Sequence, residues 1–195
     1  MITLILGGAR SGKSRFAEKM ARYYGKDDVV YIATAEIRDD EMKERIRKHQ
    51  FSRPDCWQTI EAPYRAAEEI GNLNKKQVIL LDCMTVLVSN ILMKGRDADE
   101  KEKDFNFPGR EEEIVGVVAS ILETARKLEL NLIIVSNQVG NGLIPVYKSG
   151  RDYRDIIGRV NQLIAEKADK VYLCTAGLPI EIKQEGIENL NKYGL

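Results

Sequence analysis

The sequence has 195 residues, of which 44% are hydrophobic and 31% charged, enough for one domain with a sizeable core. Thirty basic residues balance thirty acidic ones, so no overall field attracts nucleic acid or an anionic membrane. Three cysteines without C-x-x-C spacing argue against a disulfide framework and a zinc knuckle. No stretch approaches the roughly 18 apolar residues of a membrane span, and the run from Ile2 to Leu6 is too short for a signal peptide. We therefore expect one cytoplasmic domain over residues 1–195.

The chain begins with a predicted strand over residues 2–6, a glycine-rich loop and a predicted helix over residues 13–24. The loop satisfies the pattern G-x-x-x-x-G-K-[ST] with Gly7, Gly8, Ala9, Arg10, Ser11, Gly12, Lys13 and Ser14. Glycines let the backbone wrap phosphate oxygens, and amides at a helix N-terminus point at the anion. Lys13 then reaches the β- and γ-phosphates and Ser14 can hold Mg²⁺. The motif predicts a nucleoside triphosphate site.

A second predicted strand, residues 29–33, precedes a predicted helix over residues 39–50 that carries His49, the one histidine of the chain. Met42, Ile46 and His49 have the spacing of one helix face, so His49 continues an apolar stripe. That spacing favours a packed, hydrogen-bonded histidine. A neutral imidazole is also a nucleophile toward phosphorus, and the nearby cations Arg45, Lys48 and Arg53 could neutralise phosphates.

The middle of the chain has a predicted helix over residues 63–71, a strand over 78–82 and a helix over 84–94. The strand ends in Asp82, where a phosphate-loop protein places the acid beside its metal, although such an aspartate is as often a helix N-cap. Residues 94–113 are polar, and their few apolar residues do not recur at helix or strand spacing, which favours a solvated loop. A helix is predicted over residues 110–128.

The next predicted strand, residues 131–136, brings Ser136, Asn137 and Gln138 to the carboxyl edge of a sheet, where ligands of open α/β sheets bind. A glycine-containing loop then leads to a predicted helix over residues 153–168. This region carries four cations, Lys148, Arg151, Arg154 and Arg159. A flexible loop feeding a helix and a phosphate-facing lid explain it equally well.

A last predicted strand, residues 170–174, is followed by a second short strand-like run around Ala176, Gly177 and Leu178, which is typical of a hairpin. Apolar runs that do not alternate mark strands covered on both faces, as in a parallel sheet. The pattern therefore predicts an α/β fold: a doubly wound, mostly parallel sheet of the P-loop NTPase type, with a C-terminal antiparallel hairpin at one edge.

Several segments together resemble one family, and they run in order from Thr3 to Lys183. They are "GGARSGKSRFAE", "YIATAEIRDDEMKERIRKHQFSRP", "WQTIEAP", "LLDCMTVLVSN", "SNQVGNGLIP" and "YRDIIGRVNQLIAEKADKVYLCTAGLPIEIK". The chain is similar to the bifunctional adenosylcobinamide kinases / adenosylcobinamide-phosphate guanylyltransferases of cobalamin biosynthesis. The glycine loop is shared by many families, whereas R-I-x-x-H followed by R-P and W-x-T-x-E is specific.

The resemblance implies a RecA-like sheet and a two-step transferase, which phosphorylates adenosylcobinamide with ATP or GTP and then transfers GMP from GTP to that phosphate. It implies that His49 carries the GMP. Family contacts to the nucleotide would fall on the glycine loop and on Ala33, Thr34, Ala35, Gln50, Phe51, Ser52, Arg53, Glu61 and Asp82. Mg²⁺ would lie between Ser14 and Asp82, the partner would be a corrinoid, and the assembly would be a homotrimer.

One departure concerns the segment "SNQVG", where the family usually has a glutamate in place of Gln138. The change removes a charge that could serve as a base or a metal partner, so the kinase step is the one it affects. The phosphate loop also leaves two other functions open: a simple kinase of a small molecule, and a RecA-like nucleotide-switch module.

Overall fold

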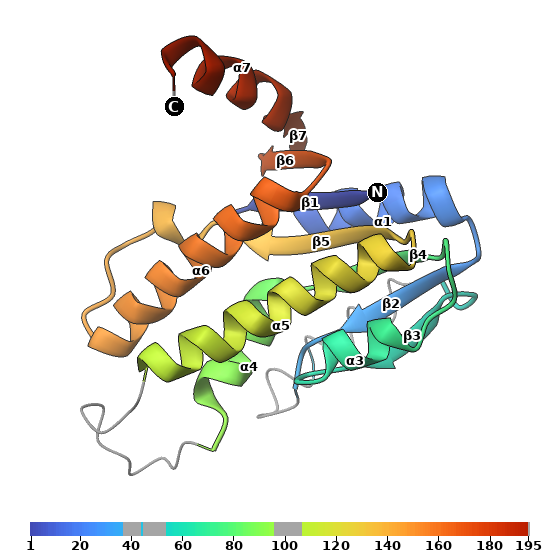
Figure 1. Cartoon of the computed structure of the whole chain (residues 1–195), viewed down its shortest axis with the longest axis horizontal. Coiled ribbons are helices and arrows are strands. Elements are labelled where there is room, and N and C mark those ends of the chain that lie inside the picture. The colour runs from blue at the N-terminus through green and yellow to red at the C-terminus, as the bar shows by residue number, and fades with distance from the viewer. Residues whose placement is uncertain (37–43, 45–53, 96–106, 195) are drawn as a thin grey trace.

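A single sheet of seven strands is the centre of the computed structural model, which describes residues 1–36, 44, 54–95 and 107–194 (Figure 1). The strands lie in the order β3-β2-β4-β5-β1-β6-β7, and each neighbouring pair is parallel except β6 and β7. The strands are β1 (Ile2–Gly7), β2 (Val29–Ala33), β3 (Gln58–Glu61), β4 (Val78–Asp82), β5 (Asn131–Asn137), β6 (Lys170–Thr175) and β7 (Leu178–Glu181). The predicted mostly parallel sheet with an antiparallel edge hairpin is confirmed.

Helices cover both faces of this sheet. They are α1 (Lys13–Gly25), α3 (Ala66–Gly71), α4 (Met84–Met93), α5 (Phe107–Lys127), the short 3₁₀ helix η2 (Val139–Asn141), α6 (Lys148–Lys167) and α7 (Lys183–Tyr193). On one face, α1 packs Ala17, Met20 and Ala21 against the strands. Helices α3, α4, α5 and α6 cover the other face. The chain is thus layered helix, sheet, helix, as a doubly wound fold requires.

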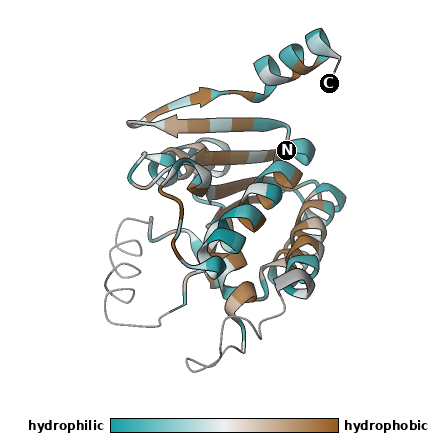
Figure 2. Cartoon of the chain, turned by 90° about the vertical axis from the view of Figure 1, so that its left-hand side faces the viewer, coloured by the Kyte–Doolittle hydropathy of each residue, from teal (hydrophilic) through white to brown (hydrophobic). Residues whose placement is uncertain are grey.

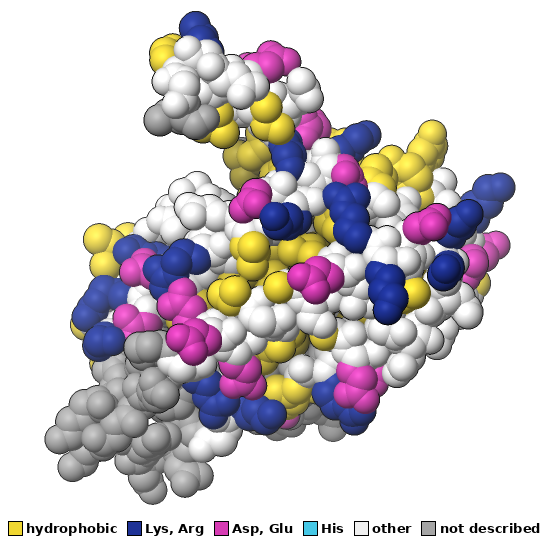
Figure 3. Space-filling model, viewed as in Figure 1, with side chains coloured by type: hydrophobic (Ala, Val, Ile, Leu, Met, Phe, Trp, Pro, Cys, Tyr) yellow, Lys and Arg dark blue, Asp and Glu magenta, His cyan; other side chains and the backbone are white. Residues whose placement is uncertain are grey.

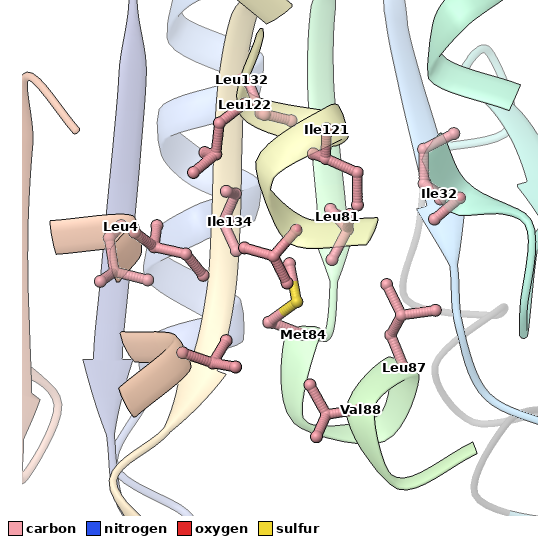
Figure 4. Packing of buried hydrophobic residues seen from close by; sticks show 14 of the residues in the cluster. Leu4, Ile32, Leu81, Met84, Leu87, Val88, Ile121, Leu122, Leu132 and Ile134 are labelled. Carbon is pink, nitrogen blue, oxygen red and sulfur yellow. The ribbon is translucent and has the colours of Figure 1, made fainter. Parts of the chain in front are cut away.

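The larger core cluster lies between the sheet and α3 to α6. Figure 4 shows Leu81, Ile134 and Met84 of this cluster converging beneath α5. Strands β1 and β2 are buried throughout and β5 is buried except at its two ends, and Figure 2 colours the central strands as the most apolar part of the chain. Because a β-strand presents alternate residues to opposite faces, a run that is apolar throughout needs helices on both sides.

The structure departs from the predicted elements at the sheet edges and at some helix ends. Strand β3 was not predicted, because Gln58, Thr59 and Glu61 are exposed at the sheet edge and carry no apolar run. Helix α6 begins at Lys148, five residues before the predicted start, and α5 begins at Phe107 rather than 110. Helix α7 was also not predicted. Residues 39–50, where a helix was predicted, lie outside the described residues except for Glu44. Residues 96–106 of the loop predicted over 94–113 also lie outside them, whereas residues 107–113 are helical, so that part of the loop prediction was wrong.

The parallel strands β1 to β6 end at one edge of the sheet, which we call the carboxyl edge. In register, Gly7 lies between Asn137 and Cys174, and Ala33 lies between Glu61 and Asp82. The segments that follow β1, β2, β4 and β5, each predicted to carry function, therefore meet at this edge. The opposite edge, where the strands begin and where Figure 1 marks the N-terminus, is called the amino edge.

Charge on the face in Figure 3 is mixed, with Lys and Arg interspersed among Asp and Glu over α5 and α6. Arg159 of α6 pairs with Glu111 of α5, and Arg110 pairs with Glu113 within α5. Among the described helices, none combines the length and the apolar character that a membrane span requires.

Candidate active site

The glycine loop connects β1 to α1 at the carboxyl edge. Gly12, the residue before α1, has φ +89°, a left-handed conformation that favours glycine. No side chain caps the helix at this position, so its first backbone N–H groups have no side-chain acceptor. Together with the helix dipole, these amides form an anion-binding site. The predicted phosphate loop thus has the backbone geometry that phosphate binding needs.

The hairpin of β6 and β7 supports this loop from the side. The amide of Gly177 donates to the carbonyl of Ser11 at 2.9 Å. A Cβ atom on Gly12 would lie 3.0 Å from the Cα of Gly177, and one on Gly7 would lie 2.8 Å from the carbonyl oxygen of Cys174. The close approach excludes larger residues. Gly177 was predicted as part of a turn, and its contact with the loop follows from β6 lying beside β1.

Two side chains of the loop lack strong internal partners. Lys13 Nζ donates to the loop carbonyl of Gly8 at 3.1 Å. Ser11 Oγ is buried and is one of three buried side-chain polar atoms of the described residues without a hydrogen-bond partner. An unpaired buried hydroxyl costs about 1–3 kcal/mol. The loop is therefore built for a ligand more than for its own stability.

Asp82 ends β4 at the same edge, half-buried, between β2 and β5. Its Oδ2 atom accepts a hydrogen bond from the hydroxyl of Tyr31 at 3.0 Å. The peptide bond that follows, between Asp82 and Cys83, is cis. The pKa of the Cys83 thiol is raised to about 11, mainly because the thiol is buried and secondly because of the negative charge of Asp82. The positive charge of Lys13 acts in the opposite direction. Lys13 and Asp82 thus lie close enough to the same thiol for their charges to act on it. This proximity is expected of a phosphate-loop lysine and the aspartate predicted to bind the metal.

Thr34 follows β2 and is fully buried. Its hydroxyl donates to the carbonyl of Cys83 and accepts from the amide of Cys83, both at 2.8 Å. Asn90 of α4 donates to the carbonyls of Thr34 and Pro63, at 2.8 and 2.9 Å. The side chain of Thr34 therefore holds the main chain beside Asp82, a role that the sequence did not indicate.

Glu61 ends β3 and is exposed, and the amide of the next residue, Ala62, donates to Ala33 at 2.8 Å. Since Ala33 is in register with both Glu61 and Asp82, two carboxylates flank the end of β2. The structure thus brings together three positions of the predicted nucleotide contacts. His49 and the predicted contacts Gln50, Phe51, Ser52 and Arg53 lie outside the described residues.

The end of β5 contributes a buried polar network. Ser136 Oγ donates to Asn161 Oδ1 at 2.7 Å, and Asn161 Nδ2 donates to the carbonyl of Asn137 at 3.2 Å. Asn137 Nδ2 donates to Thr85 Oγ1 at 3.1 Å, and Tyr153 donates to the Thr85 carbonyl at 3.0 Å. Ser136 and Asn137 are thus bonded inward and brace the edge.

Gln138 differs from these two neighbours. Its amide N–H donates to the carbonyl of Gly7 at 3.1 Å, which ties it to the start of the phosphate loop. Its half-buried side chain has no hydrogen-bond partner in the described part of the chain, and it lines a pocket of about 260 Å³. Its other walls are mainly apolar and include Leu6, Ile157 and Ile182, with the amide side chains of Asn161 and Gln162 beside them.

The four cations of the predicted loop or lid lie in the helix α6. Lys148 pairs with Asp152, Arg154 lies 3.7 Å from Asp155, and Arg159 pairs with Glu111. Arg151 donates to the carbonyls of Pro145 and Val146 and closes the turn before the helix. Each cation thus has a partner within the chain, and the part of the predicted loop from residue 148 to 152 is helical.

The phosphate loop between β1 and α1, with Asp82 at the end of β4, defines a P-loop nucleotide-binding protein. Residues 3–182 match the family model described as cobinamide kinase / cobinamide phosphate guanyltransferase, and the chain belongs to this family of transferases. The resemblance seen in the sequence is confirmed.

Two relatives are both named "Bifunctional adenosylcobalamin biosynthesis protein CobU". The one from Escherichia coli (strain K12) is 39% identical over 185 residues, 94% of this chain and 100% of the relative. The one from Salmonella typhimurium is 37% identical over 186 residues, with the same coverage. Among solved structures, the flagellar accessory protein FlaH from Methanocaldococcus jannaschii has 15% identity and a TM-score of 0.41, covering 88% of this chain and 70% of its own.

Proposed function

We propose that this protein catalyses both reactions named for its family. In the first, a nucleoside triphosphate, ATP or GTP, phosphorylates the aminopropanol hydroxyl of adenosylcobinamide. In the second, GMP passes from GTP to that phosphate, and pyrophosphate leaves, which gives adenosylcobinamide-GDP. The observation that carries the proposal is the phosphate loop with Lys13 and Asp82 at one edge, in a chain that matches the family over residues 3–182.

The phosphate loop serves both steps. The amides at the start of α1 and the ammonium of Lys13 hold the β- and γ-phosphates of the triphosphate. In the kinase step they stabilise the negative charge around the γ-phosphorus, and in the guanylyl step the same groups stabilise the pyrophosphate that leaves. One cradle can thus serve two displacements at different phosphorus atoms.

Asp82 and Ser14 fit a magnesium ion. Their carboxylate and hydroxyl oxygens are the hard donors that Mg²⁺ prefers, and it is usually held by one or two protein oxygens plus phosphates and water. Within the described residues, no group of three or more acidic, cysteine or histidine side chains offers a fuller cage. When bound, the ion would offset the charge of the phosphate oxygens.

His49 is proposed as the group that carries GMP. A ring nitrogen attacks the α-phosphorus of GTP, the bond from that phosphorus to the bridging oxygen breaks, and pyrophosphate leaves. A phosphate oxygen of adenosylcobinamide phosphate then attacks the same phosphorus, and the P–N bond breaks to restore the imidazole. Arg45, Lys48 and Arg53, close in sequence, could neutralise the phosphates.

Gln138 makes the kinase step differ from that of relatives with glutamate. A neutral amide can orient the acceptor hydroxyl through a hydrogen bond, but it cannot take up the proton that the hydroxyl loses. The side chain of Gln138 is half-buried beside Gly7, at the start of the phosphate loop. We infer a kinase step that is slow relative to guanylyl transfer.

The assembly is proposed to be a cytoplasmic homotrimer. Apolar side chains exposed on β7 and α7 support self-association, since large exposed apolar patches mark interaction surfaces. They are Leu178, Ile180, Ile187, Leu190 and Tyr193. Light scattering coupled to size exclusion would give the mass of the assembly.

The experiment that tests the function is product analysis by mass spectrometry. The protein is incubated with adenosylcobinamide, Mg²⁺ and GTP or ATP, in parallel with His49→Ala. We expect the wild-type protein to give adenosylcobinamide-GDP, and His49→Ala to stop at adenosylcobinamide phosphate. Adenosylcobinamide phosphate as the only corrinoid product of both proteins would indicate a simple kinase. Hydrolysis of the nucleotide at a rate that does not depend on the corrinoid would indicate a nucleotide-switch module.

A further inference from the structure

Tyr31 is the one fully buried tyrosine of a core cluster that is otherwise built mainly from aliphatic side chains. The cluster packs α1 against β2, β4 and β5 and contains Ile5, Leu80 and Ile133. Tyr31 is 1% exposed, yet its hydroxyl reaches Asp82 Oδ2 at the carboxyl edge, 3.0 Å away. The ring thus belongs to the core, and the hydroxyl belongs to the site.

Packing alone does not call for that hydroxyl. A phenylalanine would fill the same volume, and a buried hydroxyl is tolerated because it finds a partner. The partner here is the carboxylate at the end of the adjacent strand. Tyr31 is opposite Leu80 in the register of β2 and β4, two residues before Asp82, so the long tyrosine side chain spans the distance to the edge.

A second contact fixes the main chain on the other side of Asp82. The hydroxyl of Thr34 bonds both the amide and the carbonyl of Cys83, and the amide of Thr34 donates to the carbonyl of Asp82 at 3.3 Å. Asp82 is therefore held through its side chain by one residue of the β2 segment and through its backbone by another. A carboxylate held in this way loses little freedom when it takes up a ligand.

We propose that Tyr31 is a positioning residue for the metal-binding carboxylate of Asp82. By donating to Oδ2, the hydroxyl sets the orientation of the carboxylate and leaves Oδ1 for Mg²⁺ or for a water bound to it. This role rests on the proposed function, in which Asp82 binds the ion. Hydrogen-bonding partners behind a metal ligand typically change metal affinity or activity about 10–100-fold when removed.

The test measures binding of a fluorescent GTP analogue as Mg²⁺ is titrated, and separately in excess EDTA. For Tyr31→Phe we expect the Mg²⁺ concentration at half-saturation to rise about tenfold or more. Binding in EDTA should stay unchanged, because the phosphate loop is intact. Tyr172→Phe is the matched control: Tyr172 packs on Phe16 beside the same cluster, and its hydroxyl bonds no described residue.

Asp82→Asn and the double variant separate this inference from the proposed function. If Tyr31 acts through Asp82, Tyr31→Phe has no further effect on the Mg²⁺ requirement in the Asp82→Asn protein. An unchanged requirement in Tyr31→Phe, beside a raised one in Asp82→Asn, would overturn the inference and leave the metal assignment standing. No change in either variant would overturn both. Thermal unfolding identifies a variant that has lost its fold. In that case the Mg²⁺ requirements of the double variant and of Asp82→Asn are compared in sucrose, which favours the folded state.

Discussion

The charged groups at the amino edge of the sheet and the phosphate loop at the carboxyl edge differ in how fully they are hydrogen-bonded within the chain. At the amino edge, the terminal amine of Met1 donates to the carbonyl of Leu130 at 2.8 Å, and the amide of Ile2 donates to Asp169 at 2.6 Å. Arg126 binds both oxygens of Asp169 at 2.9 Å. At the carboxyl edge, Ser11 Oγ has no partner among the described residues and Lys13 has one loop carbonyl.

The difference indicates what each edge is for. The paired charges at the amino edge stabilise the native state, while Ser11 and Lys13 of the phosphate loop are placed for a ligand and gain partners when it binds. Substitutions at the two edges should therefore separate stability from chemistry. The predictions below run from the largest expected effect to the smallest.

Lys13→Ala should cause the largest loss. Removing the ammonium that faces the phosphates is expected to lower kcat/KM of both steps on the order of 10²–10³-fold. The thermal midpoint should hardly change, because Lys13 makes one hydrogen bond within the loop. Steady-state kinetics of each step gives the measurement, and Lys19→Ala, an exposed lysine of the same helix, is the control. Equal losses in both variants would contradict a specific role for Lys13.

Thr34→Val should affect stability and chemistry together. The change leaves the amide and the carbonyl of Cys83 without their side-chain partner, which should lower the free energy of unfolding by about 1–3 kcal/mol. Denaturant unfolding measures this loss, and Thr59→Val, at an exposed site on β3, is the control. Because Asp82 precedes Cys83, the Mg²⁺ requirement should also rise. A destabilised variant with an unaltered Mg²⁺ requirement would argue against the backbone role.

Gln138→Glu should raise the rate of the kinase step instead of lowering it. The new carboxylate can accept the proton of the acceptor hydroxyl, so the kinase rate should rise roughly tenfold, less than a fully tuned general base provides. Guanylyl transfer needs no such base and should keep its rate. Single-turnover assays with adenosylcobinamide and with its phosphate distinguish the two steps. A kinase rate that falls would show that the amide itself is required.

Asp169→Asn tests the amino edge and should have the smallest effect. Burial pushes the pKa of Asp169 up, but hydrogen bonds from Arg126 and the Ile2 amide outweigh it and hold the pKa below its ordinary 3.8. Because the folded-state pKa is depressed, its contribution is present above the unfolded-state value and is lost as pH falls through the folded pKa. At pH 7 the half-exposed pair should contribute about 1 kcal/mol.

The free energy of unfolding as a function of pH gives the measurement for Asp169→Asn. The gap between variant and wild type should close below about pH 4, as the wild-type carboxyl takes up its proton. Both catalytic steps should keep their rates at pH 7. A loss of activity without a loss of stability would contradict the division between the two edges.

Most of the central sheet could be predicted from the sequence, because strands covered on both faces read as unbroken apolar runs. The outermost strand β3 and the C-terminal helix α7 could not be predicted. Residues of β3 are exposed and carry no such run, and the exposed apolar side chains of α7 give no core to predict. The loop before α6 appeared longer than it is, because its glycines and cations conceal a helix that begins at Lys148.

The candidate site divides in the same way. The phosphate loop is local, so its spacing alone predicts it, and Asp82 follows from its place at a strand end. The roles of Tyr31, Thr34 and Gly177 depend on which strands are neighbours, which no local pattern contains. A tyrosine within a buried aliphatic strand is the one available signal, since its hydroxyl must find a partner.

The central claim is that one phosphate cradle presents GTP to His49 for transfer of GMP. Intact-protein mass spectrometry after incubation with GTP and Mg²⁺ tests it most directly. The wild-type protein should gain the mass of one guanylyl group through an acid-labile, alkali-stable bond, and His49→Ala and Lys13→Ala should gain little or none. Equal labelling of wild type and His49→Ala would contradict the account.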